Sequence, residues 1–151
     1  MMKRIALIGG GNMATALVGG LRASGVEGGR IVVADRVPAQ LDRLREQFGV
    51  DTTADNAAAA EGADLVVLAV KPQDIHAVAQ ALAPAVTAGD ALVLSVAAGV
   101  RLDALRGALG RHERVIRAMP NRPALLGTGI TALYAAAGVD EQAREAVTQW
   151  M

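Results

Sequence analysis

A glycine-rich segment near the N-terminus has the residue types and spacing of a phosphate-binding turn. Residues 9–14 read Gly-Gly-Gly-Asn-Met-Ala, between an apolar run and a stretch with helical spacing. Gly9 permits a tight turn out of a strand, Gly11 lets a pyrophosphate approach the backbone, and Ala14 lets the helix pack closely. Free N–H groups and the helix dipole favour phosphate there. The segment predicts a dinucleotide-binding turn rather than a glycine turn without a ligand.

Asp35 and Arg36 end the second apolar run and bear on the choice of cofactor. Asp35 follows the glycine turn by about 20 residues, the spacing of the acid that holds the ribose 2′-hydroxyl of NAD. An arginine beside it can instead pair with the 2′-phosphate of NADP. Arg36 is equally compatible with a solvated loop charge. Both NADPH and NADH therefore remain open as the cofactor.

The composition argues against several other kinds of site. The chain has no cysteine and only two histidines, which gives no ligand cluster, so no metal site is expected. Fifteen basic and fifteen acidic side chains balance to zero net charge, so neither nucleic acid nor a membrane surface is an expected partner. His76 is expected on a helix surface and His112 in a solvated loop, and neither is expected to be catalytic.

No apolar run approaches the roughly 18 residues of a membrane span, and no secretory signal is visible. The expected location is therefore the cytoplasm.

Short apolar runs alternate with helical patterns along the whole chain. The expected strands cover residues 4–8, 31–34, 50–52, 65–70, 91–96, 114–118 and 130–135, and the expected helices 13–24, 38–48, 56–61, 74–82, 102–109 and 140–150. Alternation of this kind predicts an α/β fold, a Rossmann-like, doubly wound, mostly parallel sheet with helices on both faces. Residues 1–151 are expected to form one dinucleotide-binding domain.

Four further motifs stand where later strands should end. They are residues 69–72 (AVKP), 95–100 (SVAAGV), 117–121 (RAMPN) and 123–125 (PAL). Together with IGGGNM at residues 8–13, they closely resemble Δ1-pyrroline-5-carboxylate reductase over essentially the whole chain. The resemblance implies reduction of the C=N bond of 1-pyrroline-5-carboxylate to L-proline, in proline biosynthesis, with NADPH or NADH as the hydride donor.

The resemblance also implies roles for individual residues. The pyrophosphate would lie on residues 8–13 and the adenosine near Asn56. Residues 69–72 would lie beneath the pyrophosphate and the nicotinamide ribose, and residues 97–99 close to the nicotinamide. The cofactor-binding residues so implied are Ile8, Gly9, Gly10, Gly11, Asn12, Met13, Asn56, Ala69, Val70, Lys71, Pro72, Ala97, Ala98 and Gly99, and the substrate-side residues are Met119, Pro120 and Asn121. Lys71 is expected to shape the site through its backbone rather than to act as a general acid.

Two features depart from the family pattern. Arg122 stands where the family more often has threonine, and this sequence is expected to lack the family's C-terminal helical domain. The resemblance implies that this second half joins subunits into a homo-oligomer and completes the site. The chain is thus expected to be the cofactor-binding half and inactive by itself. The alternatives are a non-catalytic dinucleotide-binding module or another reductase similar to β-hydroxyacid dehydrogenases.

Overall fold

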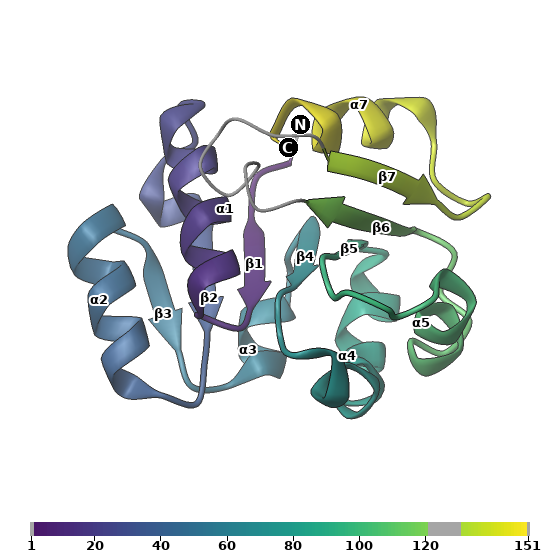
Figure 1. The fold of residues 1–151 in the computed structure, drawn as a ribbon, viewed down its shortest axis with the longest axis horizontal. Coiled ribbons are helices and arrows are strands. Elements are labelled where there is room, and N and C mark those ends of the chain that lie inside the picture. The colour runs from purple at the N-terminus through teal and green to yellow at the C-terminus, as the bar shows by residue number, and fades with distance from the viewer. Residues whose placement is uncertain (1, 121–130, 151) are drawn as a thin grey trace.

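The computed structural model describes residues 2–120 and 131–150, and these residues build a seven-stranded sheet between two layers of helices (Figure 1). The spatial order of the strands is β3-β2-β1-β4-β5-β6-β7. Neighbours from β3 to β6 pair in parallel, and β7 pairs antiparallel with β6. The strands are β1 Ile5–Ile8, β2 Ile31–Ala34, β3 Asp51–Thr53, β4 Leu65–Leu68, β5 Leu92–Ser95, β6 Val115–Pro120 and β7 Thr131–Ala135. The predicted mostly parallel α/β sheet is confirmed.

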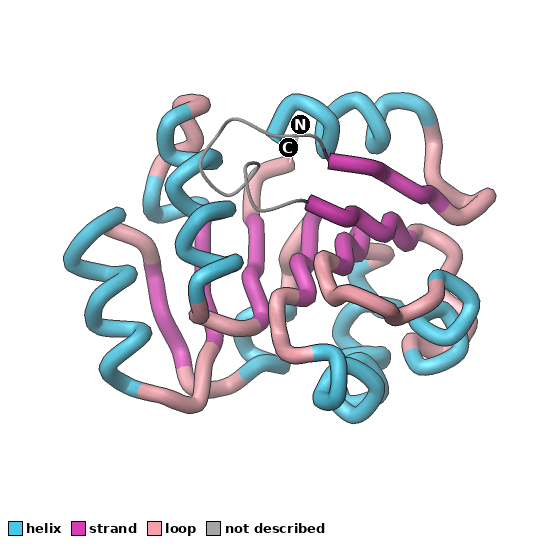
Figure 2. The backbone as a smooth tube through the Cα atoms, in the orientation of Figure 1, coloured by secondary structure: helices cyan, strands magenta, loops and turns pink. Residues whose placement is uncertain are grey.

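Helices cover both faces of the sheet, as Figure 2 shows. Side chains of α1, α2 and α7 pack into one hydrophobic cluster, and those of α3, α4 and α5 pack into another on the opposite face. The helices are α1 Asn12–Ala23, α2 Pro38–Phe48, α3 Asn56–Ala60, α4 Ile75–Gly89, α5 Leu102–Ala108 and α7 Glu141–Trp150, with short 3-10 turns η1 Gly28–Arg30 and η2 Pro72–Asp74. Among these described helices, none is both long and apolar enough to cross a membrane.

The central strands are buried on both faces. All four residues of β1 are fully buried, with Ile5 and Leu7 in one cluster and Ala6 and Ile8 in the other. Successive side chains of a strand point to opposite faces. A strand between two helical layers therefore consists of continuous apolar residues, and aliphatic side chains fill nearly all of this core.

The order of the strands creates a switch point between β1 and β4. The chain leaves β1 toward β2 and β3 on one side, then returns to pair β4 with the other side of β1. The loops that follow β1 and β4 consequently diverge in opposite directions. Ligands of open α/β sheets bind at such a point, beyond the carboxyl ends of the strands.

Local signals determine where several helices begin and end. Pro38 begins α2, at a position where a backbone N–H would have no hydrogen-bond partner within the helix. Gly49 ends the helix in the left-handed conformation, with φ +67°. Both ends were predicted. Asp55 caps α3 by accepting a hydrogen bond from the N–H of Ala58 at 3.2 Å.

Three predicted element boundaries are wrong. The strand expected over residues 65–70 ends at Leu68, so that Ala69 and Val70 lie in the loop. The helix expected over residues 74–82 runs from Ile75 to Gly89, because its apolar stripe continues past the exposed Pro84 to the buried Val86. The strand expected to end at Ala118 extends to Pro120, because β7 pairs with its last residues.

The predicted position of His112 in a solvated loop is also wrong. His112 is 8% exposed, and its Nε2 lies 2.6 Å from the carbonyl oxygen of Ala91 at the start of β5. A buried polar group needs such a partner. The charged neighbours Arg111 and Glu113 are both exposed and made the segment look solvated. His76 is exposed on α4, as predicted.

The two histidines therefore form a matched pair for a stability test. His112→Ala removes the bond to the Ala91 carbonyl and leaves a void, so we expect the free energy of unfolding to fall by about 1–3 kcal/mol. His76→Ala should change it by less than about 0.5 kcal/mol. Urea unfolding of both variants measures the difference, and equal small effects would show that the buried hydrogen bond contributes nothing.

Candidate functional site

A cleft of about 480 Å³ opens at the carboxyl ends of β1, β2 and β4, at the switch point of the sheet. Its walls come from the loops after these strands and from the first turns of α2, α3 and α4. The lining residues are Gly9, Gly10, Gly11, Ala34, Asp35, Arg36, Val37, Gln40, Asn56, Ala69, Val70, Lys71, Gln73, Asp74, Ala77 and Val78.

Gly9 forms the closest approach between the two central loops. Its φ is +107°, and a Cβ placed on it would lie 2.6 Å from the carbonyl oxygen of Ala69. Side chains are strained at such a φ, and the Ala69 backbone leaves no room for one. The Gly9 N–H also donates to the Ala34 carbonyl at 2.8 Å. Gly9 thus lets the loops after β1, β2 and β4 meet at one point.

Gly11, unlike Gly9, has open space where a side chain would lie. A Cβ on Gly11 would meet only Gln40 Oε1, at 3.8 Å, and its φ of −80° suits any residue. Gly11 caps the N-terminus of α1 with no side-chain hydrogen bond. The first N–H groups of a helix have no partner within the helix. The absent side chain leaves these groups accessible, as the sequence predicted.

The Asp35 carboxylate holds the glycine turn. Its Oδ2 accepts from the Gly10 N–H at 2.7 Å, and its Oδ1 accepts from the Val37 N–H at 2.7 Å. Charge-assisted hydrogen bonds of this kind are about twice as strong as neutral ones. The carboxylate therefore joins the loop after β1 to the loop after β2.

Arg43 braces the same turn from α2. Its Nη2 donates to the Gly10 carbonyl at 3.4 Å and to Thr15 Oγ1 at 3.1 Å, and Thr15 Oγ1 donates to the Gly11 carbonyl at 2.9 Å. Both sides of the Gly10 residue are thus held, its N–H by Asp35 and its carbonyl by Arg43. The turn is positioned before any ligand arrives.

The loop after β4 forms the opposite wall. Ala69 continues the pairing with β1 through its N–H, which donates to the Ile8 carbonyl at 2.8 Å. The Lys71 carbonyl accepts from the Asp74 N–H at 2.9 Å and so closes η2. The Lys71 side chain is exposed and has no ion pair within the described residues.

The structure brings together most of the residues predicted for the pyrophosphate and adenosine. The predicted residues that line the cleft are Gly9, Gly10, Gly11, Asp35, Arg36, Asn56, Ala69, Val70 and Lys71. The remaining predicted residues with described side chains lie outside its lining, namely Ile8, Asn12, Met13, Pro72, Ala97, Ala98, Gly99 and Met119. The side chain of Pro120 and all of Asn121 lie outside the described residues.

Residues 97–99 nevertheless follow β5 at the same edge of the sheet. The Val96 N–H donates to the Leu68 carbonyl at 3.2 Å, so the loop begins beside the end of β4. Ala98 and Gly99 are exposed there, and Met119 is 42% exposed on β6. These residues continue the same edge of the sheet beyond the cleft, and whether they contact a cofactor stays a prediction.

Sequence reasoning missed the contribution of the first turns of α2 and α4. Gln40, Gln73, Asp74, Ala77 and Val78 all line the cleft. Gln40 stands out because its Oε1 is buried without a hydrogen-bond partner among the described residues. Its position two residues after Pro38, in the first turn of α2, was a usable signal, because the first turn of a helix after a parallel strand faces the same edge of the sheet.

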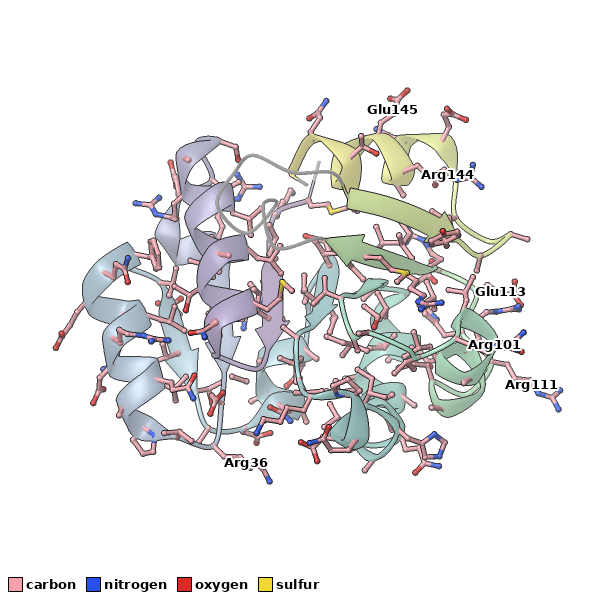
Figure 3. All side chains as sticks on the ribbon, viewed as in Figure 1. Arg36, Arg101, Arg111, Glu113, Arg144 and Glu145 are labelled. Carbon is pink, nitrogen blue, oxygen red and sulfur yellow. The ribbon has the colours of Figure 1, made fainter. Side chains whose placement is uncertain are left out.

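The charged groups of the cleft are mixed. Arg36 and Lys71 contribute positive charge, and Asp35 and Asp74 contribute negative charge. Within residues 2–120 and 131–150, no three metal-binding side chains come together. Arg36 points outward from the loop after β2, at the lower rim of the molecule in Figure 3.

A protein-family model described as NADP oxidoreductase, coenzyme F420-dependent, matches residues 4–99. The chain belongs to this family. The match spans β1 to the loop after β5, and so includes every wall of the cleft.

Individual relatives are named more specifically. The chain is 48% identical over 136 residues to the pyrroline-5-carboxylate reductase of Pseudomonas aeruginosa. The aligned residues make up 90% of this chain and 50% of that protein. A solved pyrroline-5-carboxylate reductase from Coxiella burnetii superposes with a TM-score of 0.94 at 40% identity, covering 98% of this chain and 55% of that one.

A more distant structure shares the fold. The pyrroline carboxylate reductase of Plasmodium falciparum, solved with NADP bound, superposes with a TM-score of 0.84 at 20% identity, covering 99% of this chain and 55% of that one. The chain spans about half the length of the curated relatives it matches. The resemblance inferred from the sequence motifs is confirmed.

The close contact at Gly9 gives a test with a matched control. Gly25 shares the positive φ, at +96°, but a Cβ there would meet nothing within 4 Å. We expect Gly25→Ala to lower the free energy of unfolding by about 1–2 kcal/mol through backbone strain. Gly9→Ala should cost about 1–3 kcal/mol more, because a methyl group must also displace the Ala69 backbone. Denaturant unfolding of the two variants would disprove the packing argument if their losses were equal.

Proposed function

We propose that this chain is the NAD(P)H-binding half of an oxidoreductase that reduces 1-pyrroline-5-carboxylate to L-proline. The observation that carries the proposal is the 48% identity over 136 residues with a protein of that name. Residues 1–151 would form the dinucleotide-binding domain. A helical half, contributed from beyond this domain, would join subunits and complete the substrate site, and the cytoplasmic location stays a prediction.

The cleft fits a dinucleotide on structural grounds. Gly11 leaves the N-terminus of α1 open, and a helix N-terminus with free N–H groups binds phosphate. The buried Gln40 Oε1 has no hydrogen-bond partner among the described residues, so a hydrogen-bond donor on a bound ligand would satisfy it. The family description and the Plasmodium falciparum structure both name NADP, which supports a nicotinamide dinucleotide as the ligand.

Each part of the cleft would hold one part of the cofactor. Residues 9–13 would hold the pyrophosphate on the start of α1. The loop after β2 and Asn56 would hold the adenosine side. Residues 69–72 would lie along the nicotinamide ribose, and residues 97–99 would flank the nicotinamide ring, with Met119–Asn121 on the substrate side.

A reduced nicotinamide would supply hydride when bound, and the residues of this chain would hold the dinucleotide in a fixed orientation. Asp35 and Arg43 fix the glycine turn, and with it the direction of the dinucleotide. Small residues at Ala97–Gly99 leave room for a flat ring at the carboxyl end of β5. Orientation of reacting groups removes much of the entropic barrier of a bimolecular step. No described side chain is assigned as the proton donor, which leaves that role to water or to the helical half.

Binding and turnover test the proposal separately. We expect NADPH and NADH to show altered nicotinamide fluorescence when this chain is added. The protein that contains this chain together with its helical half should oxidise the dinucleotide only when 1-pyrroline-5-carboxylate is present. Absence of binding by either dinucleotide would overturn the cofactor assignment. Binding without substrate-dependent oxidation by the longer protein would instead favour the non-catalytic module.

Gly11 allows a test that separates binding from folding. Gly11→Ala adds a methyl group with normal backbone angles and no close contact, so the free energy of unfolding should fall by no more than about 1 kcal/mol, the cost of alanine at an N-cap. The methyl group would stand between the start of α1 and the pyrophosphate, and we expect the dissociation constant for NADPH to rise about tenfold or more. Gly107→Ala on α5, also in open space, is the control and should leave binding unchanged.

A further inference from the structure

Ser95 ends β5 as a polar residue inside an aliphatic core. It is fully buried, and among the other polar residues that the structure describes only His112 is buried as well. A buried hydroxyl costs free energy unless it forms a hydrogen bond. Ser95 lies at the carboxyl edge of the sheet, where ligands of this fold bind, but it is not among the residues that line the cleft. Its hydroxyl therefore acts on neighbouring protein groups rather than on a ligand in that cleft.

The Ser95 side chain takes the place of a neighbouring strand as a hydrogen-bond partner. N–H groups two residues apart on a strand point to the same side. The Val93 N–H donates to the Arg114 carbonyl at 2.8 Å, on the side of β6, so the Ala97 N–H would face β6 if β5 continued. It donates instead to Ser95 Oγ at 3.3 Å. The chain thus leaves the sheet at Ala97 with this N–H satisfied.

The turn occurs although the neighbouring strand continues. Pairing of β5 with β6 ends where Ser95 lies opposite Arg117, whereas β6 runs on to Pro120. A partner strand is therefore present beyond Ser95, and lack of one does not explain why β5 ends there. The hydrogen bond from Ala97 to the serine hydroxyl does, because a side chain that bonds the nearby backbone competes with the ladder between strands.

Ala97 is the last buried residue before the segment predicted to face the nicotinamide. Ala97 is 4% exposed, whereas Ala98 and Gly99 are exposed. Gly99 has a φ of +73°, and a Cβ there would meet nothing within 4 Å, so space is open on that side of the loop. The positions of Ala98 and Gly99 therefore depend on how the chain leaves Ala97, which the Ser95 hydroxyl fixes.

We propose that Ser95 is a positioning residue for hydride transfer, because its hydroxyl fixes the Ala97 backbone and with it the residues that flank the nicotinamide ring. The proposal rests on the proposed function, which places that ring beside residues 97–99. Ser95 is fully buried and so does not touch the dinucleotide. The reacting atoms must lie about 3–3.5 Å apart, and a displacement of about 1 Å can lower the rate about a hundredfold. Affinity should depend less on Ser95, because the pyrophosphate and adenosine would bind at the loops after β1 and β2.

Hydrogen exchange of the ligand-free chain tests the structural step. The chain contains two serines, and Ser24 is the matched control, because its hydroxyl donates to the Leu21 carbonyl at 2.8 Å, at the far end of α1 from the glycine turn. Relative to the Val93 amide on β5, exchange of the Ala97 amide should accelerate about tenfold or more in Ser95→Ala and stay unchanged in Ser24→Ala. An unchanged relative rate in Ser95→Ala would overturn the proposal.

Binding and turnover test the functional step. Calorimetric titration with NADPH should give dissociation constants that agree within about threefold for Ser95→Ala and the unchanged chain. In the protein that also contains the helical half, the single-turnover rate of NADPH oxidation by 1-pyrroline-5-carboxylate should fall about ten- to hundredfold in Ser95→Ala. Ser95→Thr keeps a hydroxyl oxygen that can accept the same bond, so it should retain the rate within about threefold.

Three further results would contradict the proposal. The first is a rate in Ser95→Ala equal to that of the unchanged protein. The second is a loss of NADPH affinity in Ser95→Ala as large as the loss of rate, which would mean that Ser95 supports the whole cofactor site. The third is an equal loss of rate in Ser95→Ala and Ser95→Thr, which would exclude the hydroxyl as the cause. Failure of the unchanged chain to bind NADPH, or of the longer protein to oxidise it, would instead overturn the proposed function.

Discussion

The backbone contact between Gly9 and Ala69 is the constraint on which the site depends. Parallel pairing of β1 with β4 brings the two loops together at the carboxyl edge of the sheet. The loops can meet only because Gly9 has no side chain, since any Cβ would lie 2.6 Å from the Ala69 carbonyl oxygen. The pairing in turn requires a core of aliphatic side chains that buries both faces of these strands. The parallel pairing of β1 with β4 therefore links the packing of the core to the shape of the cleft.

A second set of interactions, hydrogen bonds from side chains, holds the glycine turn in place. Asp35 and Arg43 hold the two sides of Gly10, and Thr15 holds the carbonyl of Gly11. The side chains that hold the turn come from the loop after β2, from α2 and from α1, three segments separate in the sequence. A turn held from three directions loses little further freedom when a ligand binds, which favours affinity. Asp35 and Arg43 thereby also place a negative and a positive group beside the glycine turn.

Much of the fold was predictable because its signals are local. Pro38 and Gly49 mark the ends of α2, and continuous apolar runs mark the buried strands. Errors arose where tertiary contacts override local patterns. The α4 helix continues through Pro84 because its apolar stripe remains packed on the sheet, and His112 is buried because the Ala91 carbonyl offers it a partner. Strand β6 extends to Pro120 because β7 pairs with it, a contact that no local pattern reveals.

The sequence by itself determined the α/β class, the position of the glycine turn and several of the residues that line the cleft beside it. These follow from periodicity and from glycine, proline and alanine at particular spacings, which act over a few residues. Only the tertiary structure decided that Asp35 accepts from the Gly10 N–H, that Arg43 reaches the Gly10 carbonyl, and that Gln40 lies beside Gly11. The physical reason is that hydrogen bonds between segments more than 20 residues apart depend on the packing of α1 and α2 against the sheet, which sequence spacing does not encode.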